Sequence, residues 1–166
     1  MGILGKVIEF LSIELTVLLT AALPIIELRG AIPVGMSLGM SPPHAFFISF
    51  IGSMLPVPVI IFTIRPIFKE MKKTRLFRGF VDRITAKTML RSGRIRRYGF
   101  WGLILFVAIP LPGTGVWTGT LASVLLDIRF KTAFPAIFIG NLIAGTAVMM
   151  LSHGAMRTLN LISSLM

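Results

Sequence analysis

The stretch PIIELRGAIP at residues 24–33 places a carboxylate, a guanidinium and two prolines between segments that are otherwise almost wholly apolar. Proline lacks an amide proton and clashes with the preceding helical turn, so the stretch predicts an open backbone around Glu27 and Arg29. An ionisable side chain inside the hydrocarbon of a membrane is costly unless it faces protein or water. Glu27 and Arg29 are therefore candidate site residues, although an ordinary ion pair in an interfacial loop would explain the same pattern.

The composition of the 166-residue chain indicates an all-α integral membrane protein. Hydrophobic residues make up 55% of the chain and its mean hydropathy is +0.89, which is too apolar for a soluble domain of this size. The chain contains no cysteine, which excludes disulfides and thiolate metal sites. Because the sequence also has no metal-ligand spacing, catalytic triad or nucleotide-binding loop, we expect no metal, no cofactor and no enzymatic activity.

The basic residues are concentrated in residues 65–98. Twelve of the seventeen Lys and Arg residues fall in this linker, opposed only by Glu70 and Asp82, which gives it a charge of +10. The positive-inside rule makes such a linker cytoplasmic. Apolar side chains at helical spacing from Phe77 to Ile84 predict an amphipathic surface helix. We expect it to contact anionic lipid headgroups rather than nucleic acid, and a soluble partner protein is the alternative.

Residues 1–64 predict a helical hairpin followed by one crossing of the membrane. An apolar helix enters the membrane and stops at Pro24, and the apolar piece at residues 34–40 is too short to span, because about 20 residues are needed. We therefore expect a re-entrant hairpin with Glu27 and Arg29 at its tip.

The uncharged residues 45–64 are long enough for the crossing. We expect Pro56 and Pro58 to kink this helix. Pro66 suits the first turn of a new helix.

Residues 99–166 repeat the pattern. The apolar residues 101–109 are interrupted by PLPGTG at residues 110–115, and the apolar residues 116–126 are again too short to span. Residues 132–151 give a second uncharged crossing, which a weakly amphipathic tail follows.

The two halves also share letters. AFFISFIGS at residues 45–53 matches AFPAIFIGN at residues 133–141 at five of nine positions with an offset of 88, and Pro24 and Pro110 are 86 residues apart. One crossing per half gives the halves opposite orientations. We therefore predict a single membrane domain formed by an inverted repeat of re-entrant hairpin plus transmembrane helix, the plan of many secondary transporters. Chance similarity between apolar stretches is the alternative.

The motifs ELRGAIP at residues 27–33 and PLPGTGVWTG at residues 110–119 resemble those of the small multidrug export proteins, and the resemblance covers nearly the whole chain. More distantly, the plan resembles the DedA family. That family is described as having paired re-entrant hairpins in an inverted repeat, and it is linked to proton-coupled movement of undecaprenyl phosphate and other lipids. The resemblance implies a membrane transporter or lipid translocase.

If the two hairpin tips meet at the midplane, they bring Arg29 together with Gly113, Thr114 and Gly115. A guanidinium is suited to a phosphate or carboxylate. The free amides at the start of the helix after Gly115 add partial positive charge. These four residues are therefore the predicted binding site for an anionic amphipathic substrate, although helix breaking with close packing would also explain the glycines.

Glu27 is the predicted proton-coupling residue, because it could neutralise Arg29 in the empty state and be protonated when an anion binds. Glu14, about four helical turns earlier, is the second candidate. His44 and His153 flank the crossings and are expected at the membrane interface.

Three functions fit these observations. The first is proton-coupled transport or lipid translocation of an anionic amphipathic substrate. The second is export of cationic amphipathic drugs, which would require Glu27 to dominate Arg29. The third is a non-transporting scaffold that binds acidic lipids through residues 65–98. In each case we expect a multi-pass protein of the cell membrane, for which a homodimer is a possible assembly.

Overall fold

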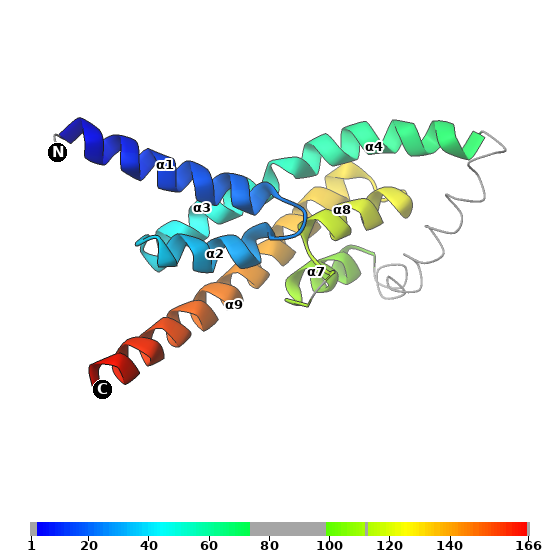
Figure 1. The fold of residues 1–166 in the computed structure, drawn as a ribbon. Coiled ribbons are helices and arrows are strands. Elements are labelled where there is room, and N and C mark those ends of the chain that lie inside the picture. The colour runs from blue at the N-terminus through cyan, green and yellow to red at the C-terminus, as the bar shows by residue number, and fades with distance from the viewer. Residues whose placement is uncertain (1–2, 74–98, 112, 166) are drawn as a thin grey trace. The chain divides into compact units, whose positions relative to one another are not determined.

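The structure is a computed structural model that describes residues 3–73, 99–111 and 113–165, and each regular element in these ranges is an α-helix. The all-α class is therefore confirmed for the described residues. The predicted amphipathic helix at Phe77–Ile84 lies outside them. The helices, labelled as in Figure 1, are α1 (Ile3–Ala22), α2 (Glu27–Ser37), α3 (Pro42–Met54), α4 (Pro56–Lys73), α7 (Phe100–Ala108), α8 (Val116–Leu125) and α9 (Phe130–Leu165).

The helices fall into two compact units, which we describe separately. Unit 1 comprises residues 1–53 and 143–166, and unit 2 comprises residues 54–142. The chain therefore leaves unit 1 at the end of α3 and returns to it within α9. Unit 1 contains the first predicted hairpin, and unit 2 contains the second.

Two segments of the described residues are long and apolar enough to cross a membrane, Pro42–Ile67 and Phe130–Thr158. They contain the predicted crossings at residues 45–64 and 132–151. The first segment is interrupted at Leu55, between α3 and α4. This break directly precedes Pro56, where the prolines predicted a kink.

One predicted helix boundary is wrong. Pro66, expected to begin a new helix, lies inside α4, which continues to Lys73. The tail that follows the second crossing is part of α9, a single helix of 36 residues. One missing hydrogen bond does not end α4, because prolines are tolerated in helices of membrane proteins where their surroundings satisfy the freed groups.

In unit 1, α1 and α2 form a helical hairpin closed by residues 23–26 (Figure 1). Gly35 on α2 permits close packing, because a Cβ at this position would lie 3.3 Å from Val17 Cγ2 on α1 and 3.1 Å from Ala45 Cβ on α3. Small residues at such contacts are typical of membrane helices. With 11 residues, α2 rises about 16 Å and cannot span a hydrocarbon core of about 30 Å.

In unit 2, α7 and α8 are joined by residues 109–115, so the break predicted at residues 110–115 is confirmed to within one residue. α8 packs on both α7 and α4. The buried core of this unit combines Val57 from α4, Leu103 from α7, Val116 from α8 and Ile137 from α9.

The short second helices of the two hairpins end in the same way. In both α2 and α8 the last turn closes with three backbone bonds in the Schellman pattern, and the residue after the C-cap has a positive φ, 92° at Gly39 and 53° at Asp127. The bonds at α2 run from the amides of Leu38, Gly39 and Met40 to the carbonyls of Val34, Met36 and Gly35. At α8 the same three bonds recur between residues that lie 88 positions further along the chain. They run from the amides of Leu126, Asp127 and Ile128 to the carbonyls of Ala122, Val124 and Ser123, respectively.

A second contact recurs in each unit. A Cβ at Gly52 of α3 would clash with the backbone oxygen of Leu18 on α1. Likewise, a Cβ at Gly140 of α9 would lie 2.8 Å from the backbone oxygen of Ile104 on α7. Gly140 follows Gly52 by 88 residues, and Ile104 follows Leu18 by 86. In both units, a glycine thus lets the crossing helix approach the backbone of the first hairpin arm.

Candidate functional site

The carboxylate of Glu27 lies at the turn of the first hairpin. Glu27 is the first residue of α2, has φ +51° and is only 7% exposed. Its backbone amide donates to the carbonyl of Leu23 at 3.1 Å, which closes the turn. A negative charge in the first turn of a helix is favoured by the unpaired amides there. The helix end thus compensates part of the cost of burying this carboxylate.

Arg29 follows on the same turn of α2, is half-buried, and interacts electrostatically with Glu27. The prediction of an open backbone over residues 24–33 is wrong, because the break covers only residues 23–26 and α2 then runs through Pro33. The helix tolerates Pro33 because a proline removes only one backbone hydrogen bond of the helix. The missing bond is the one that an amide at residue 33 would donate to the carbonyl of Arg29. The two charges are therefore held on a helix end rather than on an irregular loop.

The first turn of α2 is held in place by its apolar neighbour. Leu28 is 1% exposed, and its side chain lies against Gly145 of α9, where an added Cβ would be 3.0 Å from Leu28 Cδ1. The same glycine also contacts the ring of Phe46 on α3. Leu28 is therefore packed against α9 within unit 1. Because it lies between Glu27 and Arg29 in the chain, this packing fixes the backbone that carries both charges.

The turn of the second hairpin carries the other predicted residues. Gly113 has φ +80°, which favours glycine, and Gly115 is buried at the start of α8. The hydroxyl of Thr114 lies 2.8 Å from the carbonyl of Ile109 and 2.9 Å from that of Leu111, so its proton is donated within the turn. The side chain of Thr114 thus shapes the turn, and the groups suited to an anion are the backbone amides that begin α8.

Glu14 and His44 form a pair that sequence reasoning missed. His44 Nε2 lies 2.6 Å from Glu14 Oε1 and joins the first turn of α3 to α1 within unit 1. In a hairpin that turns at residues 23–26, a residue of α1 lies level with the residue that is about equally far beyond the turn. Glu14 lies nine residues before Leu23 and α2 has 11 residues, so Glu14 lies at the level of the segment that follows α2, and this signal could have pointed to His44.

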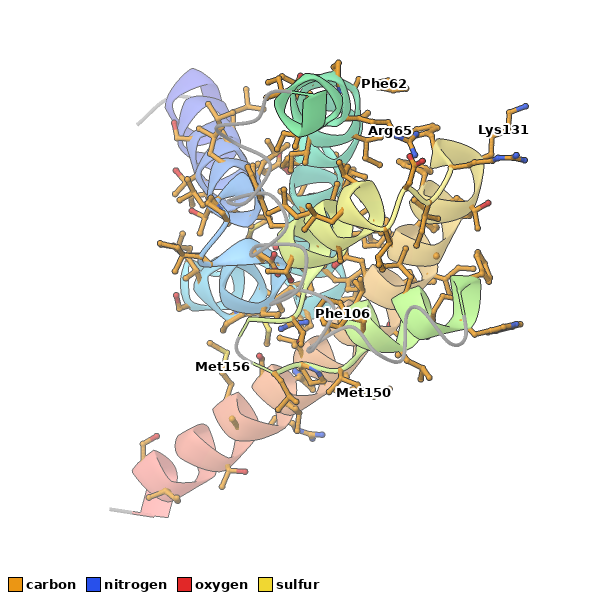
Figure 2. The ribbon with its side chains drawn as sticks, turned by 90° about the vertical axis from the view of Figure 1, so that its right-hand side faces the viewer. Phe62, Arg65, Phe106, Lys131, Met150 and Met156 are labelled. Carbon is orange, nitrogen blue, oxygen red and sulfur yellow. The ribbon has the colours of Figure 1, made fainter. Side chains whose placement is uncertain are left out.

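Arg65 and Asp127 form a second pair that sequence reasoning missed. Arg65 Nη2 donates to Asp127 Oδ1 at 3.0 Å and to the carbonyl of Ile128 at 2.8 Å. Figure 2 shows Arg65 reaching from α4 toward the turn after α8, whereas Lys131 points away from it. The pair ties α4 to the end of the second hairpin in unit 2. Finding it in the sequence would have required the path of the chain between residues 62 positions apart.

The polar residues of the crossings differ in their hydrogen bonding. Ser53 Oγ donates to the carbonyl of Phe50 at 2.9 Å, and Asn141 is 3% exposed. Ser49 is fully buried on α3, and its hydroxyl has no hydrogen-bond partner among the described residues. In the described part of the chain, no three His, Asp or Glu side chains are grouped closely enough to hold a metal ion.

Of the predicted site residues, the structure brings Glu27 and Arg29 together in unit 1, and Gly113, Thr114 and Gly115 in unit 2. Glu14 lies on α1, away from the tip. The meeting of the two tips at the midplane stays a prediction.

A family model described as putative small multi-drug export protein matches residues 27–147. Neither a curated protein nor a solved structure matches the chain. The matched residues begin at Glu27 and include both hairpin turns. The resemblance in plan to the DedA family stays a prediction.

Proposed function

Because the chain belongs to the small multi-drug export family, we propose that it is a proton-coupled secondary transporter whose site, built on the Glu27–Arg29 turn, takes an amphipathic substrate with a phosphate or carboxylate group. By its description, the family is one of small multi-drug export proteins. The observation that carries the finer proposal is the burial of a carboxylate and a guanidinium together at the end of a helix that is too short to span a membrane.

A membrane location is supported by the two apolar segments and by apolar side chains on the surface. Leu11, Leu15 and Leu19 lie on one face of α1, and each is more than half exposed. Such a stripe would be unfavourable in water but not in lipid. The basic linker at residues 65–98 is proposed to be cytoplasmic, where it would contact anionic headgroups.

The proposed architecture is an inverted repeat of two re-entrant hairpins, each followed by a crossing. Its support is the recurrence, at offsets of 86 to 88 residues, of the C-cap of α2 at α8 and of the Gly52 contact at Gly140. A match of backbone bonds is stronger support than a match of letters, because apolar stretches share letters by chance. In secondary transporters, paired interrupted segments of this kind form the substrate site.

In the proposed mechanism, Arg29 binds the anionic group of the substrate. Its guanidinium can form two parallel hydrogen bonds with a phosphate or carboxylate. Glu27 balances this charge when the site is empty and takes up a proton when the anion replaces it. Uptake of a proton with each anion keeps the charge of the buried turn constant through the cycle, which avoids an uncompensated charge in the membrane.

Export of cationic amphipathic drugs is the second candidate, and the observation that favours it is the position of the Glu27 carboxylate. Glu27 is buried while Arg29 is only half-buried. A lipophilic cation could therefore pair with Glu27 if Arg29 turned away from it.

A flux assay in reconstituted vesicles separates these functions. An amphipathic phosphate and a lipophilic cation are offered in parallel under a pH gradient to the wild type, Arg29→Lys and Glu27→Gln. Arg157→Lys is the matched control, because Arg157 is exposed on α9. We expect the wild type and the control to carry the phosphate. Arg29→Lys should carry it with reduced affinity, and Glu27→Gln should exchange it without being driven by the gradient.

Transport of the cation alone would overturn the anionic substrate in favour of the drug exporter. Absence of any flux by a folded wild type, together with retained folding of both variants, would favour the lipid-binding scaffold.

A further inference from the structure

The contact between Glu14 and His44 ties the first hairpin to the first crossing. Glu14 lies on α1, the entering arm, and His44 lies in the first turn of α3. The side chain of Glu14 is 22% exposed and that of His44 is 37% exposed. Both groups are therefore accessible enough to exchange protons, but they are partly shielded by the protein.

The other described charged side chains of unit 1 lie away from this pair. Among the described side chains of this unit, they are Glu27 and Arg29 at the hairpin tip, and His153 and Arg157 on the exposed part of α9. The hairpin turns at residues 23–26, nine residues beyond Glu14, which corresponds to about 13 Å along the axis of α1. The groups at the tip are thus separated from Glu14 by most of the length of the hairpin.

We propose that Glu14 and His44 form a proton-binding site, and that proton binding tightens the attachment of the first hairpin to α3. Histidine is the side chain whose charge ordinarily changes between pH 5 and 8. With the imidazole protonated, the 2.6 Å contact is an ion pair with a charge-assisted hydrogen bond. With the imidazole neutral, only a hydrogen bond from Nε2 remains, and that bond requires the tautomer that carries the proton there.

The site would sense the pH of the external side. His44 is near the start of the Pro42–Ile67 segment, whereas Arg65, where the basic linker begins, is near its end. With the linker cytoplasmic, the start of this segment faces outward. This inference rests on the membrane-embedded hairpin of the proposed function but not on its substrate.

The second hairpin is attached differently. In unit 2, the contact that ties the end of the hairpin to a crossing helix is made by the guanidinium of Arg65 and the carboxylate of Asp127. A guanidinium keeps its charge throughout the physiological range. Of these two attachments, the one at the first hairpin is therefore the one that contains a histidine.

The test uses the absence of cysteine in the chain. Val17 is fully buried on α1 against Gly35, so a single Val17→Cys substitution reports separation of α1 from its neighbours. The rate of labelling by N-ethylmaleimide is measured from pH 5 to 8 in lipid vesicles, with and without His44→Gln. Gln keeps a hydrogen-bond donor for Glu14 but cannot gain charge. The ratio of the two rates at each pH cancels the titration of the thiol itself.

At pH 5, we expect the protein with His44 to be labelled about fivefold more slowly than the His44→Gln variant, the factor that an ion pair worth about 1 kcal/mol would give. At pH 8, the two rates should be nearly equal. Glu14→Gln, which leaves His44 in place, should reproduce the effect if His44→Gln does not fold. His153→Gln, on α9, should leave the rate unchanged at every pH.

A rate ratio that stays constant from pH 5 to 8 in both the His44→Gln and Glu14→Gln pairs would overturn the proton-binding site. The assay contains no substrate and measures no flux. Its failure is therefore distinct from a failure of the proposed transport, which the flux assay would reveal.

Discussion

Replacing Gly52 by alanine should destabilise the protein, although alanine is the better helix former. The added Cβ would clash with the backbone oxygen of Leu18 and would lie 3.0 Å from Ala21 Cβ. Both groups belong to α1. A backbone carbonyl within a helix cannot rotate away as a side chain can, so α1 and α3 would have to move apart.

Two opposing contributions decide the size of this effect. Alanine in place of glycine within a helix stabilises it by about 1 kcal/mol. Overpacking of a close helix contact costs about 1–3 kcal/mol. Because the clash at Gly52 involves backbone, we take the upper part of that range and expect a net loss of about 1–2 kcal/mol in the free energy of unfolding.

The assay is thermal unfolding in detergent micelles, with Gly154→Ala as the matched control. Gly154 lies within α9, and an added Cβ there would meet nothing within 4 Å. The control should therefore gain up to about 1 kcal/mol from helix propensity alone. A change of 1 kcal/mol shifts the unfolding midpoint by about 2–4 °C for a chain of this size. The two variants should thus shift the midpoint in opposite directions.

Gly140 provides a second copy of the experiment. Its added Cβ would lie 2.8 Å from the backbone oxygen of Ile104 and 2.8 Å from Val107 Cβ, so Gly140→Ala should also lower the midpoint. Equal increases of the midpoint in Gly52→Ala and Gly154→Ala would refute the close approach of α3 to α1. A loss at Gly52 without a loss at Gly140 would refute the equivalence of the two contacts.

Three further variants test single contacts by the same unfolding assay. Ser49→Ala removes a buried hydroxyl without a partner and should leave stability unchanged or raise it by about 1 kcal/mol, whereas Ser53→Ala breaks a bond to a carbonyl and should lower it by about 1 kcal/mol. Thr114→Val keeps the shape of the side chain but loses the hydroxyl bonds that close its turn, so it should lower the free energy of unfolding by about 1–2 kcal/mol. Unchanged stability would refute the role of the hydroxyl in shaping the turn. Asp127→Ala should be less stable than Asp127→Gly by about 1 kcal/mol, because both lose the pair with Arg65 and only glycine accepts the positive φ freely.

The bounds of the hairpins were largely predictable from the sequence because prolines and glycines mark them. The second hairpin was predicted to within one residue, since PLPGTG combines two prolines with two glycines that cannot continue a helix. The first hairpin was predicted less well, because Pro33 reads as a breaker. In the structure α2 continues through Pro33, supported by packing of Ile32 before it and Met36 after it, which are both buried in the helix.

The polar contacts between helices were not predictable from local patterns. The partners in the Glu14–His44 pair are 30 residues apart, and those in the Arg65–Asp127 pair are 62 apart. Each contact depends on how the hairpin returns and on which crossing it meets. Local periodicity describes one helix face at a time, so it identifies candidates such as Glu14 without identifying their partners.

The two hairpins differ at the charged pair that is proposed as the site. The C-caps of α2 and α8 and the contacts of Gly52 and Gly140 recur at equivalent positions, as expected for parts that serve only the fold. The residues 88 positions after Glu27 and Arg29 are Gly115 and Trp117, so the charged pair is not repeated. A buried pair of charges contributes little net stability, and a hairpin of the same form exists without it. The presence of the pair in one hairpin alone therefore supports its proposed role in binding a ligand or a proton.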